Sequence, residues 1–115
     1  QKDVVRVFKY GEQKRDSVYV EDVVRANILA TNAKESCIVN CSSGKAVSYN
    51  DMIRIQDKIL GLKRRMEYIE NPSPATYQDH LECDLSLARE KIGFEPKFDI
   101  ESGIRAYYES GFLTA

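Results

Sequence analysis

The sequence predicts an α/β fold, because short β-branched or apolar runs alternate along the chain with segments of helical period. The run at residues 37–40 is typical of a strand that is buried on both faces. Pro72 and Pro74 exclude regular helix and central-strand pairing around them, so an irregular loop is expected there. The expected strands occupy residues 4–8, 17–20, 37–40 and 67–70.

The first expected helix spans residues 22–32 and directly follows the alternating strand at 17–20. Asp22 or Glu21 supplies the acidic side chain that favours a helix N-terminus. Arg15, two residues before the expected strand, should lie on a loop edge beside a rigid element, where binding residues are common. The expected buried stripe of the helix is broad, which favours packing on a sheet, and consists of Val20, Val23, Val24, Ala26, Ile28 and Ala30.

Three further helices are expected at residues 48–60, 84–92 and 99–111. Ser48 and Asp51 have the spacing of a capping box, and Gly61 is the expected stop of the same helix. Asp84 and Asp99 are the expected N-terminal caps of the other two. Short strands therefore alternate with helices over the whole chain.

The composition is that of an ordinary globular protein of one domain, with 115 residues, 43% hydrophobic and 30% charged. Seventeen basic residues against 18 acidic ones are interspersed, so neither a nucleic-acid footprint nor a polybasic membrane patch is present. No apolar run is long enough for a bilayer span, and three cysteines without an export signal favour free thiols in the reducing cytoplasm. The start at Gln1, within strand-like sequence, suggests a piece of a longer protein.

Several short patterns resemble catalytic motifs but lack the parts that the chemistry needs. The turn around Gly44 and Lys45 lacks both ends of a phosphate loop, although its backbone N–H groups could still serve a weaker role near a cofactor. Tyr10 and Lys14 have Y-x-x-x-K spacing, yet a Tyr-Gly loop is a poor helix for that catalytic pair. His80 is the only histidine, with neither zinc-ligand spacing nor a nucleophile elbow around it. No catalytic or metal site is therefore expected in the chain.

The remaining candidates suit an anionic ligand. Lys9, Lys14 and Arg15 lie on one loop, and Tyr77 with Gln78 follows the double-proline segment. An arginine can hold a diphosphate in a bidentate manner, and a loop tyrosine can stack on a base or donate to a phosphate oxygen.

Residues 15–24, RDSVYVEDVV, resemble the R-D-F-V-Y-V-x-D-V element of the extended short-chain dehydrogenase/reductases, which include the nucleotide-sugar epimerases and dehydratases. Residues 39–45 similarly resemble their Y-N-V-G-S-G-K/R strand and turn, with Ser17, Val39, Cys41 and Ser42 as departures. Residues 8–15, 77–85 and 100–112 resemble the ADP-glyceromanno-heptose 6-epimerase family in particular. The resemblance covers nearly the whole chain but only the C-terminal third of such an enzyme.

The resemblance implies a Rossmann-type epimerase of which residues 1–115 are the single C-terminal substrate-binding part. It further implies that Phe8, Lys9, Tyr10 and Gly11 match the loop that contacts the nucleotide sugar. Arg15 then matches the phosphate-binding arginine. Tyr77 matches a substrate-binding tyrosine near the C-terminus.

The cofactor loop and the catalytic Tyr and Lys would belong to an absent N-terminal Rossmann domain, so no cofactor is expected on this chain alone. The implied parent is a homo-oligomer that uses NADP or NAD to invert C6 of an ADP-linked heptose for lipopolysaccharide core synthesis. Another nucleotide-sugar epimerase or dehydratase remains an alternative. A non-catalytic module that binds a nucleotide sugar, or that pairs with a separate Rossmann subunit, is the second class of hypothesis.

Overall fold

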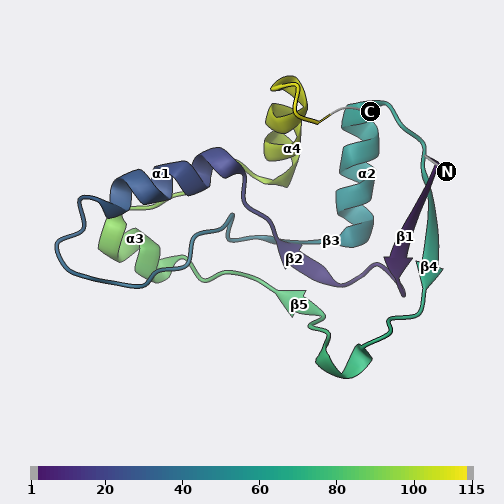
Figure 1. The fold of residues 1–115 in the computed structure, drawn as a ribbon, viewed down its shortest axis with the longest axis horizontal. Helices are drawn as coiled ribbons and strands as arrows, with labels where there is room; N and C mark the ends of the chain where they lie inside the picture. The colour runs from purple at the N-terminus through teal and green to yellow at the C-terminus, as the bar shows by residue number, and fades with distance from the viewer. Residues whose placement is uncertain (1–2, 114–115) are drawn as a thin grey trace.

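The computed structural model describes residues 3–113 as a flat α/β assembly (Figure 1), so Gln1 lies outside the described residues. Strands and helices alternate, as the sequence predicts. In chain order the elements are β1 (Val4–Phe8), β2 (Lys14–Asp16), α1 (Val20–Ala30), β3 (Ala46–Ser48), α2 (Tyr49–Leu60), β4 (Arg65–Ile69), the 3-10 turn η1 (Pro74–Thr76), β5 (His80–Leu81), α3 (Ser86–Ile92) and α4 (Ile100–Glu109).

Two small sheets organise the described chain. Strands β1 and β4 pair in parallel, with Val4 opposite Arg65 and Phe8 opposite Ile69. Strand β2 is the centre of a three-stranded sheet, antiparallel to β3 and parallel to β5. The expected strand at 4–8 is confirmed, and the one expected at 67–70 is found as β4, which begins two residues earlier and ends one residue earlier.

The caps of α2 and α4 confirm their sequence signals. The Ser48 hydroxyl accepts a hydrogen bond from the Asp51 N–H, and Gly61 ends α2 with φ of 67°. Asp99 and Ser102 form a reciprocal capping box at the start of α4, which ends at Glu109, two residues before the expected limit. These signals are local, so they are readable without knowing what the helices pack against.

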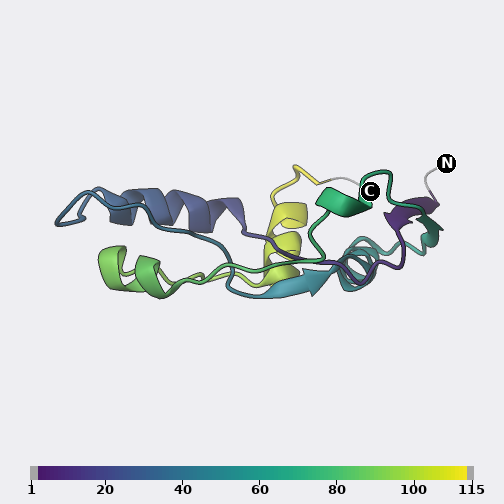
Figure 2. The ribbon, with the colours of Figure 1, turned by 90° about the horizontal axis from the view of Figure 1, so that it is seen from below.

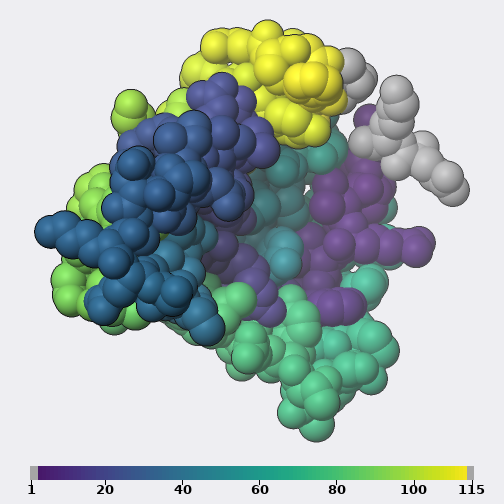
Figure 3. Space-filling view, turned by 60° about the vertical axis from the view of Figure 1, so that its left-hand side comes forward, coloured from purple at the N-terminus to yellow at the C-terminus, as the bar shows by residue number. Residues whose placement is uncertain are grey.

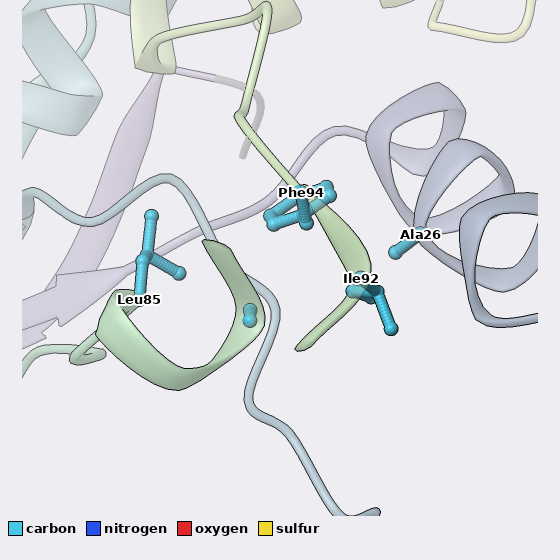
Figure 4. Close-up of a cluster of buried hydrophobic side chains, with 5 residues drawn as sticks. Ala26, Leu85, Ile92 and Phe94 are labelled. Atoms are coloured by element: carbon cyan, nitrogen blue, oxygen red, sulfur yellow. The ribbon is translucent and has the colours of Figure 1, made fainter. Parts of the chain in front are cut away.

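The buried core is small and lies between α1 and α3 (Figure 4). Phe94, fully buried, lies between Ala26 of α1 and Leu85 at the start of α3, with Ala88 and Ile92 completing the cluster. Burying a phenylalanine side chain contributes about 1.5–3 kcal/mol. This cluster therefore accounts for the attachment of α3 to α1.

The described chain is unusually thin for its length. Its extents are 50 × 38 × 16 Å and its radius of gyration is 16.5 Å (Figure 2), whereas a compact domain of about 100 residues has about 13 Å. A layer of this thickness cannot bury both of its faces. Ile38 is 92% exposed, and valines along α1 face outward.

Three expectations about the first half of the chain are wrong. Residues 17–20 are not a strand: β2 comes earlier, and α1 already begins at Val20. Residues 37–40 form no regular strand, because an apolar run becomes a strand only where another strand accepts its backbone hydrogen bonds, and no described strand runs beside it. The acidic residues expected at the N-terminus of α1 are confirmed, because Glu21 and Asp22 lie in its first turn, after Tyr19 at the N-cap.

The expected buried stripe of α1 is the third error. Of the expected stripe, Val20, Val24 and Ile28 are exposed, whereas Ala26 is buried as expected and Asp22 faces inward with it. Figure 3 shows α1 in front of α3, on the surface of the described chain. Small and polar residues face inward because α3 approaches at Ala26 and because Asp22 binds another segment, a long-range arrangement that periodicity cannot reveal.

Candidate functional site

Three residues predicted to bind substrate meet around one aromatic ring. The Tyr77 ring lies 5.4 Å from the Phe8 ring, centroid to centroid, in an edge-on arrangement. The Arg15 guanidinium carbon lies 5.0 Å from the same Tyr77 centroid, which is cation–π distance. We call Phe8, Arg15 and Tyr77 the ligand cluster. The fold brings together three positions from separate parts of the chain.

Arg15 is held more firmly than its predicted loop edge would allow. It is the middle residue of β2, opposite Val47 on β3 and Leu81 on β5. Its guanidinium Nη1 donates to the Lys14 carbonyl at 2.7 Å, its single side-chain hydrogen bond within residues 3–113. The other donors of a planar, permanently charged guanidinium are then available to an anion.

The loop at residues 8–12 joins the ligand cluster to a second aromatic edge. Gly11 N–H donates to the Phe8 carbonyl at 2.8 Å, which closes a tight turn. The Lys9 ammonium pairs with Glu70, and this hydrogen bond raises the pKa of Lys9. Tyr10 is 68% exposed, with its ring 6.2 Å from that of Tyr68. The turn thus presents a cation and an exposed ring.

Phe8 and Tyr77 also border an open cavity of about 340 Å³ between β1 and α2. Its other lining side chains are mainly apolar or amide-bearing, including Gln13, Tyr49 and Met52. Small-molecule sites combine apolar walls with a few placed polar groups. Arg15 is not among the residues that line this cavity, although its guanidinium lies 5.0 Å from the Tyr77 centroid.

Asp16, next to Arg15, has a structural role that sequence reasoning missed. Its carboxylate accepts hydrogen bonds from Ser43 N–H at 3.0 Å, Gly44 N–H at 2.9 Å and Cys83 N–H at 3.2 Å. Partial burial acts to raise the pKa of Asp16, but hydrogen bonds from the Ser43 and Ser42 hydroxyls and from Cys83 N–H outweigh it and hold the pKa below its usual value. Asp16 therefore ties β2 to two distant segments.

Asp22 ties α1 to the segment before α4 in the same way. The side chain is fully buried and accepts hydrogen bonds from Lys97 N–H and Phe98 N–H, both at 3.0 Å. Arg25 supplies a charged donor to it at 2.6 Å. We call Asp16 and Asp22 the anchoring aspartates. The only sequence signal for this role of Asp22 is an aspartate in the first turn of a helix. That signal is equally consistent with helix capping and with hydrogen bonds to a distant segment.

Backbone N–H groups of the turn at residues 43–45 are already hydrogen-bonded within the protein. Ser43 and Gly44 direct their N–H groups at the Asp16 carboxylate, so the weaker role near a cofactor is wrong for these groups. Tyr10 lies in a turn and Lys14 begins β2, which confirms that their Y-x-x-x-K spacing is not a helical pair. His80 lies in β5 and pairs with Glu82 at 3.1 Å.

The cysteines are free thiols, as predicted. Burial raises the pKa of both Cys41 and Cys83, which makes them poor nucleophiles. Within residues 3–113 no helix is long and apolar enough to cross a bilayer.

Known proteins resemble this chain in both sequence and fold. Residues 1–42 match the model of the NAD dependent epimerase/dehydratase family. The α/β arrangement also matches structures of extended short-chain dehydrogenase/reductase epimerases. The chain is thus similar to part of the proteins of the NAD-dependent epimerase/dehydratase family.

Individual relatives carry more than one specific activity in their names. An ADP-L-glycero-D-manno-heptose-6-epimerase of Alkalilimnicola ehrlichii is 36% identical over 87% of this chain and 32% of its own length. The Helicobacter pylori structure of that name has a TM-score of 0.81 and 35% identity, over 92% of this chain and 32% of its own. The Thermotoga maritima UDP-glucose 4-epimerase, solved with UDP-glucose, has a TM-score of 0.81 and 30% identity, over 95% of this chain and 36% of its own.

The chain spans about a third of the length of these relatives. The similarity to the heptose epimerases and to the UDP-glucose 4-epimerase is of nearly the same strength. The comparisons therefore show a similarity to nucleotide-sugar epimerases and do not distinguish between their sugars.

Proposed function

We propose that residues 1–115 are the C-terminal substrate-binding part of a NAD-dependent nucleotide-sugar epimerase or dehydratase. The observation that supports this most is the ligand cluster, where Arg15 projects from the centre of a rigid sheet over the Tyr77 ring. In this role Arg15 holds the diphosphate of the nucleotide sugar with the donors that the protein leaves free. Phe8, Lys9, Tyr10 and Gly11 form the loop that contacts the rest of the substrate.

We place the ADP-heptose 6-epimerase reaction first among the possible reactions. Its support is the 36% identity to the Alkalilimnicola enzyme, together with the resemblance of residues 8–15 and 77–85 to that family. The product would serve lipopolysaccharide core synthesis. A UDP-sugar 4-epimerase is the second candidate, favoured by the TM-score of 0.81 to the Thermotoga enzyme.

The chain's own residues do not fit a dinucleotide. Its glycines lie singly, with no G-x-G-x-x-G cluster, and the amides of Ser43 and Gly44 are engaged by Asp16. In our proposal the NADP or NAD, the catalytic Tyr and the catalytic Lys therefore belong to a Rossmann domain upstream. We assign this chain only the binding of the nucleotide sugar.

The outer face of α1 is the proposed contact with that domain. Val20, Val24 and Ile28 expose a continuous apolar stripe, and relatives about three times longer have further chain to cover it. Apolar stripes of this kind on a helix are normally buried against another element. A homo-oligomer of the full-length protein completes the proposal.

Substitution of Arg15 in the full-length protein tests the binding role. Arg15→Ala should raise KM for the nucleotide sugar about tenfold or more, because a charge-assisted bidentate contact is lost, while kcat changes less. Arg15→Lys should recover only part of the loss. Steady-state kinetics with an ADP-heptose and with UDP-glucose, in parallel, would also separate the two candidate reactions.

The matched control is Arg54→Ala, which removes an exposed arginine whose partner is Asp51 on α2. It should leave KM unchanged. An unchanged KM in Arg15→Ala would remove Arg15 from the site, and activity on neither sugar would exclude both named reactions.

A further inference from the structure

Asn50 occupies a position that the proposed substrate loop depends on. It lies in the first turn of α2 and is 4% exposed. Asparagine is rarely buried to this degree, and a buried amide normally has hydrogen-bond partners for its polar atoms. All the partners of Asn50 lie on, or directly beside, the loop at residues 8–12.

The two ends of the Asn50 amide bind different groups. Its Nδ2 donates to the Tyr10 carbonyl at 2.9 Å and to the Glu12 carboxylate at 2.7 Å. Its Oδ1 accepts from the Tyr68 hydroxyl at 3.0 Å. The backbone N–H of Asn50 donates to the Gly11 carbonyl at 3.1 Å. One residue of α2 therefore binds three consecutive residues of the loop.

Gly11 is shaped to receive this amide. A Cβ atom at Gly11 would lie 2.0 Å from the Asn50 Oδ1, far inside van der Waals contact. The φ of Gly11 is 76°, in the left-handed region that favours glycine. The backbone of the loop and the side chain of Asn50 are thus fitted to each other, and neither can shift alone.

The consequence reaches the exposed groups of the loop. Tyr68, which binds the Asn50 oxygen, is the ring beside exposed Tyr10. At the other end of the turn, the Phe8 ring contacts the Tyr77 ring, and the Arg15 guanidinium lies over that same Tyr77 ring. The orientation of the Tyr10 ring relative to the ligand cluster is set by this turn.

We propose that Asn50 is a positioning residue for nucleotide-sugar binding: it fixes the turn at residues 8–12 so that Tyr10 stands at a defined place beside the Phe8–Arg15–Tyr77 cluster. The inference rests on the proposed function, since it is the nucleotide sugar that the turn is positioned to meet. Asn50 acts through the turn and does not touch the ligand.

Two variants of the full-length protein test the proposal. Asn50→Asp keeps the shape and can still accept from Tyr68, but it cannot donate to Tyr10 and it faces the Glu12 carboxylate. Tyr68→Phe removes only the hydroxyl on the other side of the amide. Asn32→Asp, at an exposed position beyond the end of α1, is the matched control. The measurements are amide hydrogen exchange of residues 8–12 without ligand, and KM, kcat and direct binding of the nucleotide sugar.

We expect faster exchange in residues 8–12 and KM and Kd about tenfold higher in Asn50→Asp, with kcat within about twofold of the parent protein. Tyr68→Phe should show a smaller change in the same direction. Combining Asn50→Asp with Glu12→Gln should recover part of the affinity, because the new amide can donate to the new carboxylate. A purely structural role would instead lower the fraction of folded protein, and so the apparent kcat, while KM stayed unchanged.

The possible failures are distinguishable. Unchanged exchange in residues 8–12 would overturn the positioning role, whatever the ligand. Faster exchange with unchanged KM and Kd would also overturn it, since the turn would then not matter for binding. If the parent protein itself binds no nucleotide sugar, the proposed function fails and the inference fails with it.

Discussion

The anchoring aspartates lie close in sequence to Arg15 of the ligand cluster, yet the side chains of the two groups are used in opposite ways. The carboxylates of Asp16 and Asp22 accept hydrogen bonds from backbone N–H groups of distant segments. Arg15, directly before Asp16, makes one side-chain hydrogen bond among the described residues and lies over the face of the Tyr77 ring. Polar groups whose hydrogen bonds are made within the protein stabilise the fold, whereas a rigidly held group with free donors is suited to binding a ligand.

The largest effect expected from this comparison is the loss of Asp22. Asp22→Ala leaves the Lys97 and Phe98 N–H groups without their acceptor and leaves the Arg25 guanidinium with only the Glu95 carbonyl among the described residues. We expect the free energy of unfolding to fall by about 3–5 kcal/mol. Urea denaturation followed by circular dichroism measures it, with the exposed neighbour Glu21→Ala as control, which should stay within about 0.5 kcal/mol of the parent protein. A loss of similar size in both variants would contradict the anchoring role.

The second effect is a loss of folding stability at low pH that depends on Asp16. Its folded-state pKa lies below the ordinary value of 3.8, so its contribution to stability is present above about pH 4 and is lost as the pH falls through the folded-state pKa. Asp16→Asn should therefore lower the free energy of unfolding by about 1–3 kcal/mol at pH 7. The gap between parent and variant should close below pH 4.

Urea denaturation at intervals from pH 3 to pH 7 would show this convergence. Other carboxylates titrate in the same range, so the quantity to follow is the difference between the two proteins at each pH. A difference that stays constant with pH would mean that the Asp16 charge does not matter to the fold.

The smallest effect on the fold should come from Tyr77, which belongs to the ligand cluster. Tyr77→Leu removes the ring that Arg15 and Phe8 share, at a cost of about 1 kcal/mol in stability. In the full-length protein it should raise KM about fivefold, because Arg15 loses its support. Tyr77→Phe keeps the ring and should stay close to the parent protein in both measurements. Equal damage from both variants would point to the hydroxyl instead of the ring.

How far the sequence predicts this molecule depends on the range of the interaction. The α/β class, β1, α2 and α4 follow from local signals, such as the Ser48 and Asp99 caps, that act within one turn. The inner face of α1 was predicted only at Ala26, and the burial of Asp22 could not be predicted because its backbone N–H partners lie more than fifty residues away. The apolar run at 37–40 was misassigned for the same reason.

The candidate site divides in the same way. Arg15, Phe8 and Tyr77 were predicted from a resemblance of motifs, and the structure places them together. Asn50 and Asp16 gave no signal, because a buried amide or carboxylate is recognisable only from the distant groups that it binds. In the sequence, Asn50 looks like any polar residue in a first helical turn.

The most direct test of this account measures stability and affinity on the same variants. Calorimetric titration of the full-length protein with the ADP-sugar, alongside urea denaturation, should be made for Arg15→Ala and Asp16→Asn at pH 7. We predict that Arg15→Ala binds at least about tenfold more weakly with unchanged stability, and that Asp16→Asn is less stable but binds normally while folded. Unchanged binding in Arg15→Ala, with a loss of stability in its place, would contradict the account.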